Sequence, residues 1–326
     1  MKLIKASAKI EDISKLSFPK AIEIAARNCY KSEGKISKDD SSAITLFSKL
    51  YKNGHHAMFE FGHDLIISLG GGKTELSEYL KKEKYITHST LGKRVFSGSL
   101  RVWINILNTI PHSFVNDVKI AVKLALERYD GGNDIVNIIT KEGVGVKSTT
   151  IKGLIIDELT KEERYIHESE TVRFIVDRGI SHELVRHRPQ AFAQESTRYV
   201  NYKDSDIEFI TPVWFSDDDI IKAQKFIDSK DTDNVDITFK DPLVLSWLNT
   251  MDDSTYIYKR MIKQGWTPQQ ARSILPTSLK TEILTKAKLS QWKHLLKLRT
   301  HKTAHPQFVE VAVPLFEEMK HKLKNI

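Results

Sequence analysis

The sequence has almost no cysteine. Cys29 is the single cysteine among 326 residues, which excludes an internal disulfide framework and a cysteine-based zinc cluster. It shares one apolar stripe at helical spacing with Ile22, Ala25 and Ala26. We therefore expect Cys29 to be a buried helix cysteine, with a nucleophilic role as the alternative.

Long hydrophobic runs are also absent. No stretch approaches the roughly 20 apolar residues that span a bilayer, and the N-terminus lacks the apolar core of a signal peptide. We therefore expect a cytoplasmic protein without a membrane partner. Hydrophobic residues make up 40% of the chain and charged residues 28%, as in ordinary folded proteins. The length allows one elaborated domain or two modest ones.

Acidic residues are fewer than basic ones, 42 against 50. The formal net charge is +8 and the pI is about 9.2, which suggests anionic partners, although the excess is modest and spread along the chain. Zinc-finger, RNP and continuous basic-arm motifs are missing. A specific nucleic-acid partner is therefore not expected, and a nucleotide-sized anion fits as well.

Hydrophobic periodicity predicts a mixture of helices and strands. Ser181 is expected to cap a helix that ends near the triplet Arg186-His187-Arg188, because Pro189 disfavours further helix. The C-terminal third is predicted to be helical, with a kink at Pro314. The other predicted helices are 18–30, 41–53, 99–109, 114–128, 217–229 and 242–264, and the predicted strands are 55–69, 172–176 and 207–215.

The segment 73–169 carries several helical patterns but no cluster of chemically reactive residues. We expect it to be a largely helical insertion or subdomain within a single domain that spans residues 1–326.

Cationic and hydrogen-bonding side chains gather in the stretch "RHRPQAFAQESTRYVNY", residues 186–202. A basic helix end would explain the triplet alone. Ser196 and Arg198 follow closely, however, and guanidinium groups combined with hydroxyls are typical of phosphate recognition. Ser196 could also be imagined as a nucleophile, but no nucleophile-elbow glycine pattern surrounds it, so binding through its hydroxyl is preferred.

Arg299 lies on the apolar face of its predicted helix, together with Trp292, Leu295 and Leu296. Burying an unpaired charge costs several kcal/mol, so either an internal carboxylate or a bound anion must complete this site. The sequence leaves both alternatives open. The same two alternatives apply to Arg272, for which the sequence evidence is weaker.

His55, His56 and His63 flank a predicted strand and suggest a metal site only weakly. Glu60 and Asp64 point to the same side of that strand, whereas the three histidines do not all do so. We therefore expect no metal ligands in this chain.

Several of these motifs, in this order, resemble the flavin-dependent thymidylate synthases. The triplet 186–188 followed by Ser196 and Arg198 is similar to the signature of that family. "NGHHAMFEF" is similar to its histidine-containing loop, and "ARSILPTSLKTEI" through "AHPQFVEVAVPLFEE" resembles its C-terminal block. The resemblance covers roughly residues 18–70 and 170–320.

The resemblance implies reductive methylation of dUMP to dTMP, with methylenetetrahydrofolate as carbon donor, FAD as redox carrier and NADPH as electron source. It also implies an α+β fold, with a mixed or antiparallel sheet flanked by helices. The enzyme would be a homotetramer with active sites at subunit interfaces.

Site residues carried over from the resemblance fall into three groups. Catalytic roles are implied for Arg299, Ser196 and His55, with Arg299 favouring the ionised pyrimidine. The residues implied to bind FAD are His55, Ala57, Glu60, Arg186, His187, Arg188, Gln194, Lys288, Ser290 and His294. Those implied to bind dUMP are Glu183, Arg186, Gln194, Glu195, Ser196, Thr197, Arg198, Arg272 and Arg299.

Lys288 and Ser290 depart from the family pattern, which usually has an asparagine and an arginine near FAD before Trp292. A related one-carbon transfer, such as hydroxymethylation of a pyrimidine nucleotide, is therefore an alternative. Two further hypotheses are a non-catalytic nucleic-acid-binding protein and, least favoured, a serine hydrolase.

Overall fold

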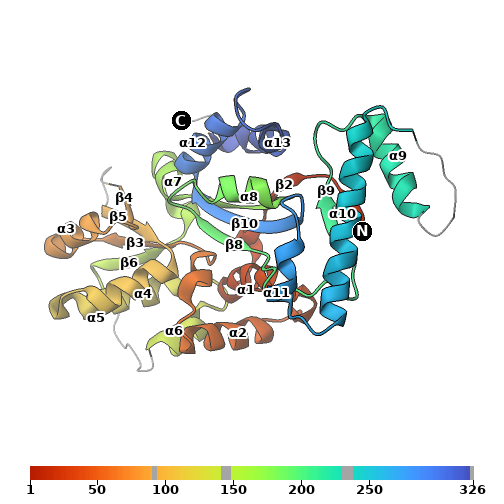
Figure 1. Cartoon of the computed structure of the whole chain (residues 1–326). Coiled ribbons are helices and arrows are strands. Elements are labelled where there is room, and N and C mark those ends of the chain that lie inside the picture. Colours follow the sequence, from red (N-terminus) through yellow and green to blue (C-terminus); the bar gives the residue numbers. More distant parts are fainter. Residues whose placement is uncertain (90–93, 141–147, 230–237, 324–326) are drawn as a thin grey trace.

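The computed structural model describes residues 1–89, 94–140, 148–229 and 238–323. Within these residues the chain forms two four-stranded antiparallel sheets and a separate parallel pair of short strands. Helices cover both faces of the central sheet (Figure 1). The fold is therefore α+β, as expected.

The central sheet has the strand order β2 (Ser7–Glu11), β7 (Ser169–Asp177), β10 (Lys280–Lys288) and β8 (Ala191–Gln194). The predicted strand at 172–176 is confirmed, because Val172, Phe174 and Val176 are buried on one face of β7. Phe174 lies opposite Ile283 of β10. Both belong to one hydrophobic core with Trp292 and Phe308.

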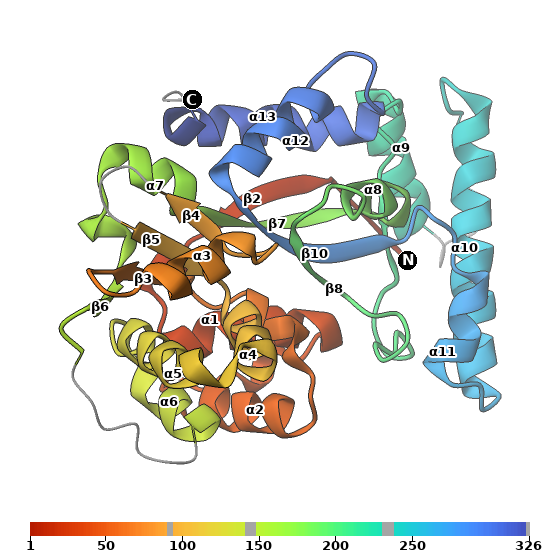
Figure 2. The ribbon, with the colours of Figure 1, turned by 90° about the vertical axis from the view of Figure 1, so that its left-hand side faces the viewer.

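Two different layers of helices cover this sheet (Figure 2). On the Phe174 face lie α8 (Arg178–Leu184), α12 (Leu289–Arg299) and α13 (Pro306–Leu323). The opposite face carries Leu284 and Ala193, which pack against Ala25 of α1 (Phe18–Tyr30). The sheet therefore separates the α1 side of the molecule from the α12 side.

β10 corrects the prediction that the C-terminal third is helical. Its sequence "KTEILTKAK" contains three lysines, so its apolar alternation is weak. Lys280 and Lys286 are nevertheless buried, because Glu195 and Asp64 neutralise them within the protein. The partners that make this strand possible are distant in sequence.

The second sheet has the order β4 (Thr87–Ser89), β5 (Arg94–Gly98), β3 (Leu65–Leu69) and β6 (Ile151–Leu154). The expectation of a largely helical insertion at 73–169 was therefore incomplete, because three strands of that segment join β3. Its helices are α3 (Thr74–Lys82), α4 (Leu100–Thr109), α5 (His112–Leu126), α6 (Gly132–Thr140) and α7 (Lys161–His167).

The predicted strand from His55 was wrong in its first half. The chain forms a short 3₁₀ helix, η3 (His56–Glu60), and the strand begins only at Leu65. The His55 N–H still bonds to the Leu50 carbonyl of the preceding helix, and Phe59 is buried against Phe47 with ring centroids 4.4 Å apart. These contacts hold the segment in a turn.

The cap of α8 also differs from the prediction. Asp177 accepts a hydrogen bond from the Ile180 N–H at 2.7 Å, so the helix begins before Ser181. It ends at Leu184, close to the basic triplet as predicted.

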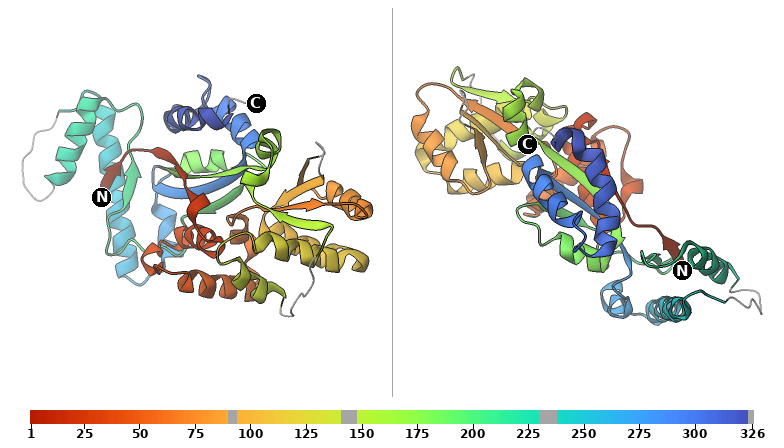
Figure 3. Two further views of the ribbon diagram at one scale, coloured as in Figure 1. Left: turned by 180° about the vertical axis from the view of Figure 1, so that it is seen from behind. Right: turned by 90° about the horizontal axis from the view of Figure 1, so that it is seen from above.

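The remaining elements agree broadly with the sequence patterns, and α9 and α10 lie at one edge of the molecule (Figure 3). No helix within the described ranges combines the length and apolarity needed to cross a bilayer. The remaining elements are α2 (Ser41–Lys52), α9 (Asp217–Asp228), α10 (Pro242–Lys263), α11 (Pro268–Ala271), β1 (Lys2–Ile4), β9 (Glu208–Ile210), η1 (Ile13–Lys15), η2 (Glu33–Lys35), η4 (Ile156–Glu158) and η5 (Arg272–Ile274).

Candidate functional site

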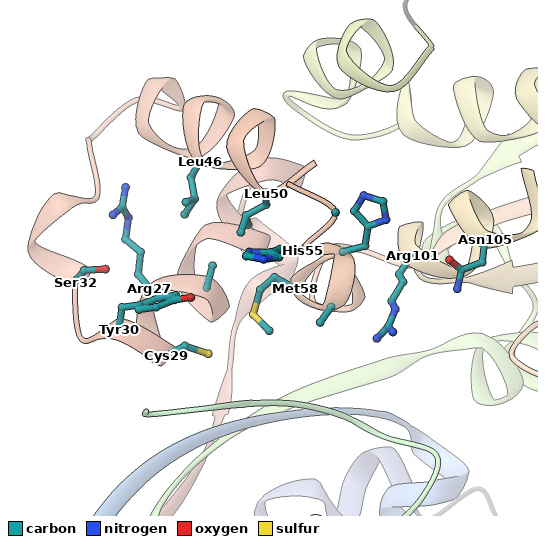
Figure 4. A pocket seen from close by; sticks show the side chains of 14 residues that line it. Arg27, Cys29, Tyr30, Ser32, Leu46, Leu50, His55, Met58, Arg101 and Asn105 are labelled. Carbon is teal, nitrogen blue, oxygen red and sulfur yellow. The ribbon is translucent and has the colours of Figure 1, made fainter. Parts of the chain in front are cut away.

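A pocket of about 570 Å³ opens between α1, α2, the segment 54–58 and α4. Figure 4 shows Arg27, Cys29 and Tyr30 on one side, Arg101 and Asn105 on the other, and His55 and Met58 between them. The wall thus combines apolar side chains with imidazole and guanidinium groups. We call this cavity the α1 pocket. Its lining residues are Ala26, Arg27, Cys29, Tyr30, Ser32, Leu46, Leu50, Gly54, His55, His56, Ala57, Met58, Arg101 and Asn105.

The turn after α2 presents two of the predicted flavin residues to this pocket. Gly54 has a φ of +68°, which favours glycine and lets the chain reverse at the end of the helix. His55 and Ala57 follow and are exposed in the cavity. Glu60 lies one turn further on and accepts a hydrogen bond from Arg101 at 2.7 Å.

Cys29 lines the same pocket from the end of α1. Burial raises the pKa of its thiol to about 11. The thiol is therefore protonated near neutral pH, and a thiolate nucleophile is disfavoured. This supports its interpretation as a helix cysteine: it packs beside the core around Ala25 and Leu284 and also borders the cavity.

A second group of predicted residues meets on the α12 side of the sheet. Arg299 donates to Glu183 at 2.5 Å and to the Nε2 atom of His187 at 2.9 Å. Its guanidinium carbon lies 4.7 Å from the ring centroid of Phe308. The internal carboxylate that the sequence left open is thus Glu183. These bonds use two of the five guanidinium N–H groups.

His187 is held neutral in this cluster. Burial, followed by the charges of Arg299 and His294, lowers the pKa of His187 to about 4. The neutral ring accepts the Arg299 hydrogen bond through Nε2. Glu183, His187 and Arg299, which we call the Arg299 cluster, therefore form one hydrogen-bonded unit.

The stretch after α8 connects the two regions. Gln194 donates to Ser181 at 2.9 Å and to Thr281 at 3.1 Å. The Ser196 N–H donates to the Cys29 carbonyl at 2.9 Å, which joins this turn to the helix lining the α1 pocket. The sequence-predicted residues thus occupy two neighbourhoods instead of one.

Glu195 and Thr197 are buried, with 3% and 6% exposure. Glu195 accepts hydrogen bonds from Tyr202 at 2.9 Å and Lys280 at 3.2 Å. Its carboxylate is thereby committed within the protein. It supports the turn that carries Ser196.

The predicted arginines of this region are exposed. Arg186 and Arg188 lie in the loop after α8, and Arg272 lies at the end of α11. Arg198 donates to Gln269 at 3.0 Å and stacks over the Tyr199 ring, 5.2 Å from its centroid.

Arg178 was missed by the sequence analysis. It is the first residue of α8, and its Nη1 atom is buried without a hydrogen-bond partner among the described residues. Burial lowers its pKa, as does the nearby charge of Arg272, whereas Tyr202 and Glu195 act in the opposite direction. An unpartnered guanidinium nitrogen near a second arginine fits an anion. In the sequence, the only indication of this role was that Arg178 comes directly after the predicted strand, in "DRG".

The Lys288 ammonium group is bonded to other parts of the protein. It donates to Asp64 at 2.7 Å, to the His167 carbonyl at 2.7 Å and to Ser97 at 3.4 Å, so all three donors are used within the protein. Lys288 therefore links the two sheets, and these internal bonds argue against its predicted contact with FAD. Ser290 and His294 are exposed on α12.

Comparison with known proteins identifies the family. The family model described as "Thymidylate synthase complementing protein" matches residues 119–323. The chain belongs to this family. The matched region includes the Arg299 cluster and the arginines around Ser196, whereas His55 and the α1 pocket precede it.

Family members with curated names include a "Flavin-dependent thymidylate synthase" of Pyrococcus furiosus, 30% identical over 164 residues, which are 48% of this chain and 58% of that protein. One from Pyrococcus horikoshii is 31% identical over 173 residues, 50% of this chain and 62% of the relative. One from Mycobacterium tuberculosis is 27% identical over 144 residues, 44% and 54% respectively. The similarity thus spans little more than half the length of these relatives.

Proposed function

We propose that this protein is a flavin-dependent thymidylate synthase that converts dUMP to dTMP, with methylenetetrahydrofolate, FAD and NADPH as its other reactants. One observation carries the proposal: within the family-matched region, Arg299 of α12 bonds to Glu183 of α8 and to His187 of the loop that follows α8. A cytoplasmic location is part of the proposal.

The monophosphate would bind to the arginines around the start of α8. Arg178 has an unused buried donor, and Arg272 lies within electrostatic range of it. The Ser196 hydroxyl and Arg198 add further donors in the turn after β8. Planar guanidinium groups bind phosphate in a bidentate way. Arg186, Gln194 and Thr197 complete the proposed nucleotide-binding set.

Arg299 would act on the pyrimidine ring. A guanidinium beside the ring stabilises negative charge that develops there, which makes C5 more nucleophilic. His187, being neutral, fixes the orientation of Arg299 without adding a competing positive charge. Glu183 holds the other side of the same guanidinium. This arrangement requires no thiolate, in agreement with the raised pKa of Cys29.

The α1 pocket suits a flavin nucleotide. Its Met58, Leu46 and Leu50 side chains offer an apolar wall, while Arg27 and His55 offer groups that interact with phosphate or a polarised ring. When bound, FAD supplies the redox chemistry of the methylation. The remaining flavin contacts are proposed for Ala57, Glu60, Arg186, His187, Arg188, Gln194, Ser290 and His294.

The positions of these groups support a site shared between subunits. Met58 packs with the residues on the α1 face of the central sheet, whereas Phe308 beside Arg299 belongs to the core on the opposite face. A single chain therefore keeps the α1 pocket and the Arg299 cluster on different sides. We propose a homotetramer in which one subunit supplies the pocket and another supplies Arg299.

Binding measurements test this proposal directly. The purified protein is expected to bind FAD, and dUMP is expected to raise its unfolding temperature by mass action. Single-stranded oligonucleotides serve as the competing ligand. A protein that cannot be reconstituted with FAD, and that oligonucleotides but not dUMP protect against heat, would refute the enzyme assignment.

A further inference from the structure

The two four-stranded sheets have the same construction. Their orders, β4-β5-β3-β6 and β8-β10-β7-β2, correspond strand for strand, and every neighbouring pair in both sheets is antiparallel. Each sheet also places a helix directly after its third strand in that order: α3 follows β3, and α8 follows β7.

The register of the inner strands agrees as well. Leu65 of β3 lies opposite Gly98 of β5, and Glu170 of β7 lies opposite Ala287 of β10. Two residues beyond each of these positions a helix begins, α4 after Gly98 and α12 after Ala287. The residues that begin these helices, Leu100 and Leu289, are both buried.

A buried tryptophan marks the same position in both helices. Trp103 of α4 donates its indole N–H to the carbonyl of Leu65 at 3.4 Å. Trp292 of α12 donates to the carbonyl of Glu170 at 3.0 Å. Leu65 and Glu170 are equivalent by the register above, so the same hydrogen bond joins helix to sheet in both halves. The helix that follows packs on the fourth strand in each case, α5 on β6 and α13 on β2.

The two halves differ at the positions that carry chemistry. Arg299 of α12 corresponds to Ile110, which is buried at 7% exposure after α4. Ser290 and His294 of α12 correspond to Arg101 and Asn105 of α4. The first half therefore has an apolar residue at the position of Arg299, and it has a cation and an amide where the second half has a hydroxyl and an imidazole.

Arg101 and Asn105 both line the α1 pocket, on the side opposite Arg27 (Figure 4). The Arg101 side chain is 41% exposed, and Glu60 holds it at 2.7 Å. Glu60 comes from the same turn that presents His55 and Ala57 to the cavity. The guanidinium is thus both accessible and fixed in direction.

We propose that residues 65–126 are a degenerate copy of the unit formed by residues 169–323, and that this copy serves the α1 pocket by binding the phosphate groups of FAD through Arg101 and Asn105. The inference rests on the proposed function and assigns a role to the segment 73–169. Glu60 positions Arg101, and a neutral amide beside a guanidinium adds a hydrogen-bond donor for phosphate oxygen.

The test compares two matched arginine variants. Arg101→Gln removes the charge in the pocket, and Arg128→Gln removes an arginine that is also 41% exposed and bonded to a glutamate, Glu158, at 2.8 Å outside the pocket. Arg101→Gln is expected to raise the Kd of FAD by roughly tenfold to a hundredfold, because a charge-assisted hydrogen bond is lost. Arg128→Gln should leave that Kd unchanged.

Three ligands separate the outcomes. Riboflavin lacks phosphate, so its Kd should be the same for Arg101→Gln and wild type. Asn105→Ala should likewise raise the Kd of FAD and leave the Kd of riboflavin unchanged. Equal FAD affinity in Arg101→Gln and wild type overturns the inference. Weaker binding of methylenetetrahydrofolate to Arg101→Gln, with unchanged FAD affinity, overturns it as well. Failure of the wild type to bind FAD at all overturns the proposed function itself. Unfolding temperatures without ligand show whether each variant is folded.

Discussion

At the scale of single residues, sequence reasoning identified groups that need partners but not the partners themselves. Arg299 was predicted to need an internal carboxylate or an anion, and Glu183 supplies the carboxylate across 2.5 Å. Lys288 was assigned to a cofactor, yet Asp64 binds it from more than 200 positions away. Such long-range pairs leave no local pattern in a single sequence.

Arg299→Ala is expected to lower kcat for dTMP formation by about 10²–10³-fold, because one preorganised electrostatic contact to the reacting ring is lost. The protein should stay folded, since Glu183 is 32% exposed and water can solvate it once the arginine is gone. Steady-state kinetics and a thermal melt measure the two effects.

Arg299→Lys is the matched control for that variant. It keeps the charge but loses the planar guanidinium that bonds Glu183 and His187 at the same time, so an intermediate activity is expected. Full activity in Arg299→Ala, or a loss that thermal unfolding alone explains, would rule out a role at the pyrimidine.

His167 makes folding stability depend on pH. Burial, followed by the charge of Lys288, lowers its pKa to about 4, whereas an unfolded histidine titrates near 6.5. The unfolded state therefore binds more protons between these values, and stability falls as the pH drops from about 6.5 to 4. The contribution is on the order of 3 kcal/mol.

The variant His167→Asn removes this contribution while leaving an amide near Ser97. Urea unfolding at several pH values should show a steeper loss of stability for the wild type than for the variant below pH 6.5. Parallel curves for the two proteins would mean that His167 does not titrate as described.

At the scale of elements, amphipathic helices were predicted well and one central strand was missed. α1 and α2 follow clear apolar stripes and begin where expected. β10 was missed because its buried lysines interrupt the alternation of apolar and polar residues that is typical of a strand. The turn at His55 resembles a strand in sequence because its period-two pattern arises from Phe59 and Phe61 packing into two different cores.

The contact between β6 and α5 requires a residue without a side chain. A methyl group on Gly153 would lie 2.0 Å from the Leu124 carbonyl oxygen, so the two backbones would have to separate. Gly153→Ala is expected to destabilise the protein by about 1–3 kcal/mol. Gly71→Ala is the control, because a methyl group there meets nothing within 4 Å. Equal denaturation midpoints for both variants would contradict this close packing.

At the scale of the whole molecule, the family resemblance and the net charge could be judged from the sequence, but the internal repeat could not. Its two halves share residues such as Leu100 with Leu289 and Trp103 with Trp292, too few for a pattern to stand out. Only the register of the strands aligns them.

The proposed shared active site predicts complementation between subunits. Arg299→Ala and His55→Ala should each be inactive alone, because each removes one contributor to every site. Co-expressed and co-assembled, they should regain part of the activity, since some sites would then combine intact halves. A mixture no more active than its components would indicate that each chain builds its own site.

The central claim is that the guanidinium groups of this family member bind a pyrimidine monophosphate for one-carbon transfer. Mass spectrometry of the nucleotide formed from dUMP, methylenetetrahydrofolate, FAD and NADPH tests it most directly. The account predicts dTMP with wild-type protein and only trace product with Arg299→Ala. Unreacted dUMP, or a hydroxymethylated nucleotide in place of dTMP, would contradict it.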